Sequence, residues 1–318
     1  MIDKKFSNLP YDIINVHPRL TPRYLMSPFN TEYLDINNRI ALKAKKLNNN
    51  IAFVDKYFND GKSNSYITKS GKDAIAVILR HLRLIKGDEV CIINTSGSPY
   101  ISSCVTDEIN RLCSFSRQVT RATKCIFVIH EFGYPAEIPN NIIKLKLPII
   151  EDCAYALSSQ NKKKNVGKIG DYTIYSFSKM FPVQYGGLIR SKQSLSVSSD
   201  ISEYSLNYLL ALLVFYFKKN NDFQRKRLIN YSKYVDLFAQ FGIYPLFKLK
   251  TNNIPAAFVF QLSCNPISDN LKTELNAMGV ESTVYYGGDG FYIPCHQNLT
   301  DTDIEYIFKN VIKLLNKN

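Results

Sequence analysis

The sequence predicts an α/β fold in which helices cover both faces of a largely parallel sheet. From about residue 66, short apolar runs alternate with longer runs of helical periodicity. Turn residues bound the short runs, whose near-continuous apolar character is typical of strands buried on both faces. With 318 residues, 45% of them hydrophobic, the chain can bury a large core as one domain or two.

The elements of this sheet domain follow in order. Residues 73–85 carry apolar side chains at helical spacing, and Lys86-Gly87-Asp88 ends this helix. Strands are expected at 90–93, 125–129, 148–151, 173–177 and 188–189. The apolar run at 206–217 is too short for a bilayer, which takes about twenty residues, so we expect a buried helix or a subunit interface there, and no transmembrane segment.

A smaller second domain is expected toward the end of the chain. Residues 222–241 have the pattern of a long amphipathic helix, 256–262 and 280–286 that of strands, and 301–315 that of a closing helix. We therefore expect a large α/β domain over residues 1–221 and a smaller α+β domain over 222–318. The first 60 residues have no pattern that we can interpret.

The chain is basic, with 40 Lys and Arg against 27 Asp and Glu and a net charge of +13. Such a surface can attract nucleic acid, an anionic membrane or an acidic metabolite. The positive residues are spread in ones and twos, and the densest run, at 161–165, is typical of a solvated loop. Zinc-finger, RNP and basic-zipper patterns are missing, so we expect no nucleic-acid partner.

The cysteines and histidines indicate neither disulfides nor a metal. Seven cysteines include no C-x-x-C pair, and several lie in apolar runs, as Cys91 and Cys125 do. The four histidines lack metal-ligand spacing. Residues 1–10 have no apolar segment of the kind found in signal peptides. These features predict buried reduced thiols and a cytoplasmic location.

Two short motifs place polar groups where strands or turns end. The turn Thr68-Lys69-Ser70-Gly71-Lys72-Asp73 runs directly into a helix, whose free N–H groups and dipole favour an anion. Alone it is equally the cap of a helix. The strand 148–151 leads into Asp152, at the carboxyl edge of the sheet where α/β proteins bind ligands. Asp152 alone could also cap a helix.

Two further motifs supply a lysine and an aromatic ring. Ser176-Phe177-Ser178-Lys179 follows a strand, and Gly186-Gly187 comes shortly after it. A lysine in this place can form a Schiff base, and partial burial would lower its pKa toward the nucleophilic neutral form; alone, it could equally be a surface lysine. The strand at 90–93 runs on to Ser98-Pro99-Tyr100, which places an aromatic ring on the following loop.

In combination, these features occur in the order typical of pyridoxal-phosphate (PLP) enzymes of the aspartate-aminotransferase type. The sequence resembles the DegT/DnrJ/EryC1/StrS family of sugar aminotransferases, as a short and divergent member. The stretches that carry the resemblance are SGKDAI (70–75), KGDEVCII (86–93), VIHEFGYPAEI (128–138), IIEDCAYALSS (149–159), VGKIGDYTIYSFSK (166–179), YGGLI (185–189) and IPCHQNLTDTDIEYI (293–307). The resemblance implies the PLP-dependent transferase fold of type I, with a seven-stranded, mostly parallel sheet.

The resemblance also implies roles for individual residues around the cofactor. Lys179 falls at the lysine that binds PLP covalently and moves protons, and Asp152 at the carboxylate that pairs with the pyridine nitrogen. Ser176, with the N–H groups of Gly71 and Lys72, falls where the family holds the phosphate. Lys72 replaces a residue that is usually threonine.

Further residues follow with a less regular match. Tyr100 is the candidate to stack on the ring, and Tyr155 replaces the Gln or His that usually lies near the ring hydroxyl, a bond that a phenol can also donate. Asn207 is a faint match to an asparagine that reaches the neighbouring subunit's phosphate. His296, Tyr285 and Tyr286 are candidates to contact substrate, and each could instead be structural.

The leading hypothesis is a PLP-dependent aminotransferase that moves an amino group from an amino acid, with glutamate as the expected donor, to a keto-sugar nucleotide. The product would enter surface-polysaccharide or related sugar biosynthesis, and relatives imply a homodimer. Two alternatives remain open: a PLP enzyme with another reaction or a smaller substrate, and a non-catalytic partner subunit. Lys179 argues against the family's dehydratase branch, which has histidine at that position. The sequence does not reveal which sugar, keto position or stereochemistry is used.

Overall fold

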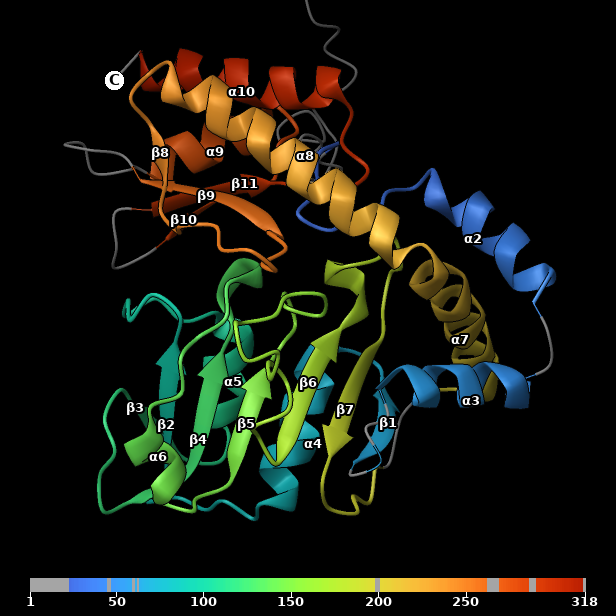
Figure 1. Ribbon diagram of the computed structural model, residues 1–318, viewed down its shortest axis with the longest axis vertical. Helices are drawn as coiled ribbons and strands as arrows, with labels where there is room; N and C mark the ends of the chain where they lie inside the picture. Colours follow the sequence, from blue (N-terminus) through green and yellow to red (C-terminus); the bar gives the residue numbers. More distant parts are fainter. Residues whose placement is uncertain are drawn as a thin grey trace, which may run out of the picture.

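The computed structural model describes residues 23–44, 47–58, 61, 63–197, 201–261, 269–285 and 290–316. Two sheets organise these residues, a sheet of seven strands and a sheet of four. In Figure 1 the seven-stranded sheet fills the lower half of the molecule and the four-stranded sheet lies above it. The predicted boundary between residues 221 and 222 stays a prediction.

The large sheet has the strand order β1-β7-β6-β5-β4-β2-β3. Neighbouring strands from β3 to β6 run parallel, whereas β7 runs antiparallel to both β6 and β1. The mostly parallel α/β fold predicted from the sequence is thereby confirmed. The strands are β1 (Asn64–Thr68), β2 (Glu89–Asn94), β3 (Ser114–Ser116), β4 (Thr123–Ile129), β5 (Ile149–Asp152), β6 (Tyr172–Ser176) and β7 (Gly187–Ser191).

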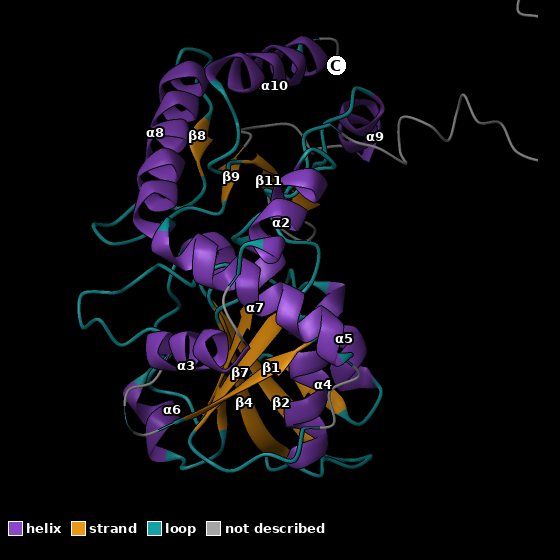
Figure 2. Ribbon diagram, turned by 90° about the vertical axis from the view of Figure 1, so that its right-hand side faces the viewer, coloured by secondary structure: helices purple, strands orange, loops and turns teal. Residues whose placement is uncertain are grey.

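Helices cover both faces of this sheet (Figure 2). On one side lie α4 (Gly71–His81) and α5 (Ser103–Asn110), and on the other lie α3 (Leu47–Phe58) and α6 (Asn140–Lys144). Ser70 begins α4 because its side chain accepts a hydrogen bond from the Asp73 N–H. Ile75, Ile78 and Leu79 then fall on one face of α4 and are buried against the strands.

The apolar run at 206–217 lies within α7 (Glu203–Lys218), which contacts α2 (Tyr33–Leu42) and α3. Its leucines at 209, 210, 212 and 213 are buried, as the sequence predicted for a helix inside the protein. Two short 3₁₀ turns, η2 (Glu131–Gly133) and η3 (Phe177–Lys179), follow β4 and β6. Among the described residues no helix combines the length and the apolar character needed to cross a membrane.

The four-stranded sheet is antiparallel, with the order β10-β11-β9-β8. Phe258, Phe260 and Phe291 of this sheet form, with Phe238 of α8, the centre of a core that the helices complete. The strands are β8 (Tyr244–Pro245), β9 (Ala257–Gln261), β10 (Thr283–Tyr285) and β11 (Gly290–Pro294), and the helices are α8 (Asn220–Ala239), α9 (Asp269–Ala277) and α10 (Asp301–Leu315).

One predicted helix ends earlier than its pattern suggested. The apolar periodicity extends to Ile85, but α4 ends at His81 because the backbone of Arg83 turns into the left-handed region, with φ of 53°. Leu84 then folds back into the core, whereas Ile85 is 67% exposed. The apolar periodicity of the sequence therefore extends beyond the residue at which the helix ends.

Candidate active site

The site begins at the carboxyl ends of two neighbouring parallel strands. Asp152 is the last residue of β5 and Ser176 the last residue of β6, and these strands pair in parallel. Lys179 follows Ser176 by one 3₁₀ turn. The topology therefore brings together the carboxylate, the hydroxyl and the lysine that the sequence motifs singled out, at the edge where open α/β sheets bind ligands.

Asp152 is a buried carboxylate without a cationic partner close enough for an ion pair among the described residues. One of its oxygens, Oδ1, accepts a hydrogen bond from the Ala154 N–H at 2.9 Å. Burial raises its pKa, and the Ala154 N–H, Lys179 and His130 only partly offset that rise. A carboxylate held in this way is suited to a cationic ligand group.

Lys179 lies with Nζ 4.0 Å from the centre of the Tyr155 ring. Burial alone would lower its pKa, but the charges of Tyr155 and Asp152 outweigh burial, and the pKa of Lys179 is raised. The sequence reasoning considered burial alone and therefore expected the opposite direction. In the protein without a ligand, the lysine is held in its protonated form.

The turn before α4 packs against Ser176 and the glycine pair. A Cβ added to Gly71 would lie 3.1 Å from the Cβ of Ser176, and one added to Gly187 would lie 2.5 Å from the carbonyl carbon of Ser70. Only glycine allows the approach at Gly187, and a side chain at Gly71 would require Ser176 to shift slightly. The N-terminus of α4 and the Ser176 hydroxyl therefore lie side by side, as a phosphate-binding site requires. The Lys72 side chain points elsewhere, with Nζ 3.5 Å from the Glu108 carboxylate.

Aromatic rings from both sheets lie beside Lys179. The Tyr100 ring lies 4.7 Å from the Tyr285 ring, and its hydroxyl lies 3.1 Å from that of Tyr292. Lys179 and Tyr155 both influence the pKa of Tyr100, which burial raises, so Tyr100 belongs to the same group of side chains. These rings can cover one face of a planar ligand.

Glu131 is a buried carboxylate that sequence reasoning missed. It accepts hydrogen bonds from the Asn94 amide at 3.0 Å, from the Ser96 N–H at 2.7 Å and from the Tyr285 hydroxyl. Tyr285 also shares a hydrogen bond of 2.7 Å with the Ser96 hydroxyl. Glu131 therefore ties the loop before Tyr100 to β10. The hydroxyl of Tyr285 would have to leave these partners to meet a substrate.

Arg227, on α8, is a second residue that sequence reasoning missed. It is 1% exposed, and it donates to Oε1 of Gln297 at 2.7 Å and to the carbonyls of Lys179 and Met180 at 3.2 and 3.3 Å. Gln297 in turn donates to the Met180 carbonyl at 3.0 Å. Burial lowers the pKa of Arg227 to about 10, which leaves it charged. The pair fixes the segment that carries Lys179 to the second sheet.

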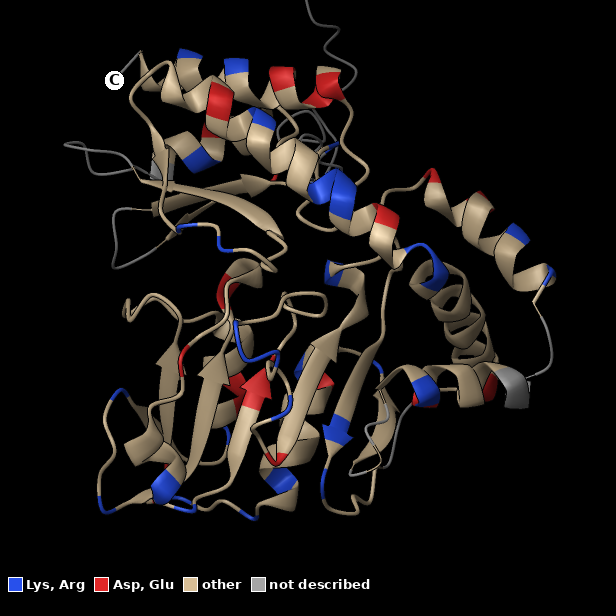
Figure 3. Cartoon of the chain, viewed as in Figure 1, with Lys and Arg blue, Asp and Glu red and all other residues tan. Residues whose placement is uncertain are grey.

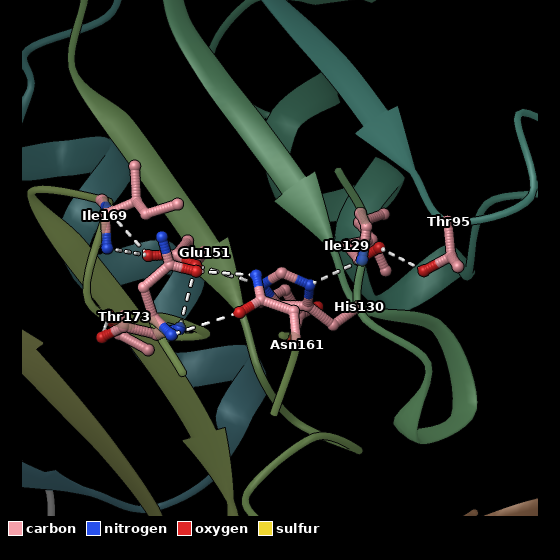
Figure 4. A network of polar contacts seen from close by, with 12 residues as sticks. Thr95, Ile129, His130, Glu151, Asn161, Ile169 and Thr173 are labelled. Atoms are coloured by element: carbon pink, nitrogen blue, oxygen red, sulfur yellow. Dashed lines mark hydrogen bonds and ion pairs between the residues drawn. The ribbon is translucent and has the colours of Figure 1, made fainter. Parts of the chain in front are cut away.

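Behind Asp152 lies a buried pair formed by Glu151 and His130, which face each other in Figure 4 at 3.1 Å. Glu151 also accepts hydrogen bonds from the N–H groups of Gly167, Ile169 and Gly170. Burial would raise the pKa of Glu151, but His130 and these N–H groups outweigh it and lower that pKa. The His130 N–H bonds the Asp152 carbonyl, so this network positions the end of β5.

Three of the predicted site residues lie apart from this group or outside the description. His296 is buried, with Nε2 3.1 Å from the Leu25 carbonyl, and burial with the charge of Arg227 lowers its pKa to about 3. Asn207 lines a separate pocket of about 500 Å³ between α2 and α7, and its Oδ1 is buried without a hydrogen bond. Tyr286 lies outside the described residues.

Part of this chain is similar in sequence to known aminotransferases. Residues 112–197 match the sequence model of the DegT/DnrJ/EryC1/StrS aminotransferase family. A UDP-N-acetyl-3-dehydro-α-D-glucosamine 3-aminotransferase of Acidithiobacillus ferrooxidans is 32% identical over 124 residues, which cover 34% of each chain. A dTDP-3-amino-3,6-dideoxy-α-D-galactopyranose transaminase of Aneurinibacillus thermoaerophilus is 31% identical over 127 residues, again 34% of each. The matched part thus spans about a third of these curated relatives.

Solved structures share the fold over a much larger part of the chain. Helicobacter pylori PseC, an aminotransferase involved in the biosynthesis of pseudoaminic acid, has a TM-score of 0.69 at 16% identity, covering 93% of this chain and 100% of PseC. An aminotransferase from Psychrobacter cryohalolentis has a TM-score of 0.68 at 16% identity, with 92% and 99% covered. At this identity the likeness concerns the fold.

The fold is the one that these aminotransferases share, the PLP-dependent transferase fold of type I. The match at residues 112–197 and the related curated sequences agree with the family that the sequence motifs predicted. This stretch of the chain is therefore similar to the DegT/DnrJ/EryC1/StrS aminotransferase family.

Proposed function

We propose that the protein is a PLP-dependent aminotransferase that transfers an amino group from an amino acid, with glutamate as the expected donor, to a keto-sugar nucleotide. The observation that carries the proposal is the pairing of β5 and β6, which brings Asp152 and Lys179 to one edge of the sheet. Curated relatives that act on UDP- and dTDP-linked sugars support the substrate class. The amino sugar would serve polysaccharide or related sugar biosynthesis.

The residues present fit the cofactor. Asp152 is buried, its pKa is raised by burial, and it forms no ion pair within the described part of the chain, so a protonated ring nitrogen would supply the missing cation. The N-terminus of α4 and Ser176 form a site for a phosphate beside it. When bound, PLP supplies an electron sink that allows an amino group to pass between an amino acid and a ketone.

Each residue of the site has a separate task. The Asp152 carboxylate holds the proton on the ring nitrogen, and Ser176 with the N–H groups of Gly71 and Lys72 binds the phosphate. Tyr100 covers a ring face and excludes water, and Tyr155 donates a hydrogen bond to the ring hydroxyl. The position of these residues at the carboxyl edge of the sheet supports these roles.

Lys179 would anchor the cofactor through Nζ and would then move the proton at the substrate's α carbon. Asp152 is one of the charges that raise the pKa of Lys179. A cationic ring nitrogen beside Asp152 would offset that charge, so occupancy of the site favours the neutral amine that the reaction needs. The protonated lysine of the ligand-free protein is therefore compatible with catalysis.

Covalent trapping tests the assignment of Lys179 directly. The purified protein is incubated with PLP, reduced with borohydride and digested, and the peptide masses are mapped. We expect a pyridoxyl group on Lys179, and none at that peptide in Lys179→Ala. Labelling spread over surface lysines would contradict the proposed site. Trapping at Lys179 without transfer from any amino donor would favour the partner-subunit alternative.

We further propose that two copies associate through the face around α2 and α7. Leu42 and Tyr204 line the pocket there and are 86% and 81% exposed, and the orphan Oδ1 of Asn207 lies in the same pocket. A second copy would cover these apolar side chains and give Asn207 a partner. The protein would then be a homodimer, and the free thiols of the described cysteines support a reducing, cytoplasmic setting.

Mixing two inactive variants tests whether this face completes an active site. Lys179→Ala lacks the lysine, and Asn207→Ala lacks the proposed contact to the other copy's phosphate. If each active site uses residues of both copies, random mixing makes half of the dimers heterodimers, and one of the two sites in each heterodimer is intact. The mixture should therefore regain up to about a quarter of the wild-type activity. Light scattering that finds a monomer with full activity would contradict the dimer.

A further inference from the structure

The loops at the foot of the large sheet, opposite the candidate active site, carry a concentration of exposed cations. They precede β2, β4 and β5, follow β7, or end α4, and in Figure 3 blue segments of the ribbon, which mark Lys and Arg, lie along this lower edge. Eight such side chains are exposed: Arg80, Arg83, Lys86, Arg121, Lys124, Lys144, Lys146 and Lys192. None of the eight forms an ion pair within the part of the chain that the structure describes.

The carboxylates at the same edge are turned inward. Asp88 accepts a hydrogen bond from the Ile85 N–H at 3.0 Å, and Asp171 accepts one from the Ile149 N–H at 2.9 Å. Glu89 accepts from the hydroxyls of Ser116, Thr120 and Thr123, and these bonds lower its pKa against the opposing effect of burial. All three carboxylates are half-buried, so the outermost charge of the edge is positive.

Exposed aliphatic side chains stand between the cations. Ile85 is 67% exposed and lies between Arg83 and Lys86 in the sequence, and Leu145 is 44% exposed between Lys144 and Lys146. Val119 and Ile143, at 38% and 41%, add to the same loops. The backbone of both Arg83 and Lys146 is left-handed, with φ of 53° and 57°, so two tight turns present these side chains. None of these four aliphatic side chains is buried in the core of the protein.

We propose that this basic edge, defined by the eight cations and four aliphatic residues above, docks on the surface of an anionic lipid bilayer. Lys and Arg near such a surface are attracted by its negative potential, and aliphatic side chains on neighbouring turns can enter the headgroup region. Nucleic acid fits less well, because these tips offer aliphatic side chains rather than aromatic rings for bases. The candidate active site lies at the opposite edge and stays open to solution.

Vesicle sedimentation tests the proposal with the intact protein and without any cofactor or substrate. Vesicles of phosphatidylcholine with 40% phosphatidylglycerol are compared with pure phosphatidylcholine vesicles, at low salt and at 0.5 M salt. We expect binding to the anionic vesicles alone, weakened by salt. Each surface cation contributes about fivefold in affinity, so Lys86→Glu/Lys144→Glu should bind at least about 30-fold more weakly.

The matched control is Lys226→Glu/Lys313→Glu, which makes the same change in net charge at exposed positions on α8 and α10. It should bind much more tightly than the test variant. Ile85→Ser/Leu145→Ser should also weaken binding, by an amount that high salt does not remove. An equal loss of vesicle binding in the test and control variants would show that binding depends on net charge alone, and it would overturn the proposal. So would binding to a nucleic-acid duplex without binding to anionic vesicles.

Discussion

Replacing Arg227 by methionine tests how the second sheet positions the lysine. Arg227 donates to Gln297 and to the carbonyls of Lys179 and Met180, and it is buried without a carboxylate bonded to it among the described residues. Methionine fills a similar volume and removes both the charge and the donors. The change separates the stability that Arg227 supplies from its effect on Lys179.

The change in stability should be modest because two large contributions oppose each other. The Met180 carbonyl keeps its bond from Gln297, and the bond from Arg227 to the Ala256 carbonyl is long, at 3.5 Å. The Gln297 and Lys179 oxygens therefore each lose a charge-assisted hydrogen bond worth about 1.5–3 kcal/mol. Burial lowers the pKa of Arg227 from 12.5 to about 10, which corresponds to a desolvation penalty of about 3 kcal/mol for the buried cation. The methionine variant does not have this penalty. The net loss in unfolding free energy is about 0–3 kcal/mol.

The loss of activity should be larger than the loss of stability. A displacement of about 1 Å in a reacting group can reduce the rate about a hundredfold. We expect kcat to fall by about that factor, with little change in KM, and Arg227→Lys to recover part of it. The assay is the steady-state rate with glutamate, beside denaturant unfolding of each variant. A wild-type rate in Arg227→Met would refute the positioning role.

Three further predictions concern single side chains. The pKa of His296 is about 3 in the folded protein against its ordinary value of 6.5, so below pH 6.5 His296 binds a proton mainly in the unfolded chain. The free energy of unfolding should therefore fall by about 2 kcal/mol between pH 6.5 and 5. Denaturant unfolding of His296→Gln should lack this pH dependence. Tyr285→Phe loses the bonds to Glu131 and Ser96 and should cost about 1–3 kcal/mol with KM unchanged; a raised KM at unchanged stability would mean substrate contact instead. Gly187→Ala places a Cβ against the Ser70 backbone and should weaken PLP binding at least tenfold in a spectroscopic titration, and unchanged affinity would contradict the shape assigned to the phosphate site.

Local signals sufficed for the strands that carry the site, because each is a short apolar run ended by a turn. The expected strand at 148–151 corresponds to β5 (Ile149–Asp152), and the helix expected at 301–315 is α10 with the same bounds. The strands β1 and β3 escaped notice because Asn64–Thr68 and Ser114–Ser116 contain too few apolar residues to stand out. α2 and α3 lie in the first 60 residues, where we could interpret no pattern, and both pack against α7.

Some residues of the candidate site could likewise be predicted from the sequence, and others could not. Asp152 and Ser176 end neighbouring parallel strands, and Lys179 follows Ser176 by one 3₁₀ turn, so their proximity follows from the topology. Arg227 and Glu131 are also buried near the site, but nothing in the sequence around these charged residues indicates that they are buried. Their roles depend on how the second sheet meets the loops of the first. The raised pKa of Lys179 likewise depends on neighbours that sequence spacing does not reveal.

The central claim is that Lys179 and Asp152 hold a PLP group that accepts an amino group. The most direct measurement is the visible absorbance spectrum of the purified protein supplied with PLP, before and after glutamate is added, with Lys179→Ala beside it. The account predicts a yellow band in the wild-type protein that bleaches with glutamate and is missing or altered in the variant. A wild-type protein with no such band in excess PLP would contradict it.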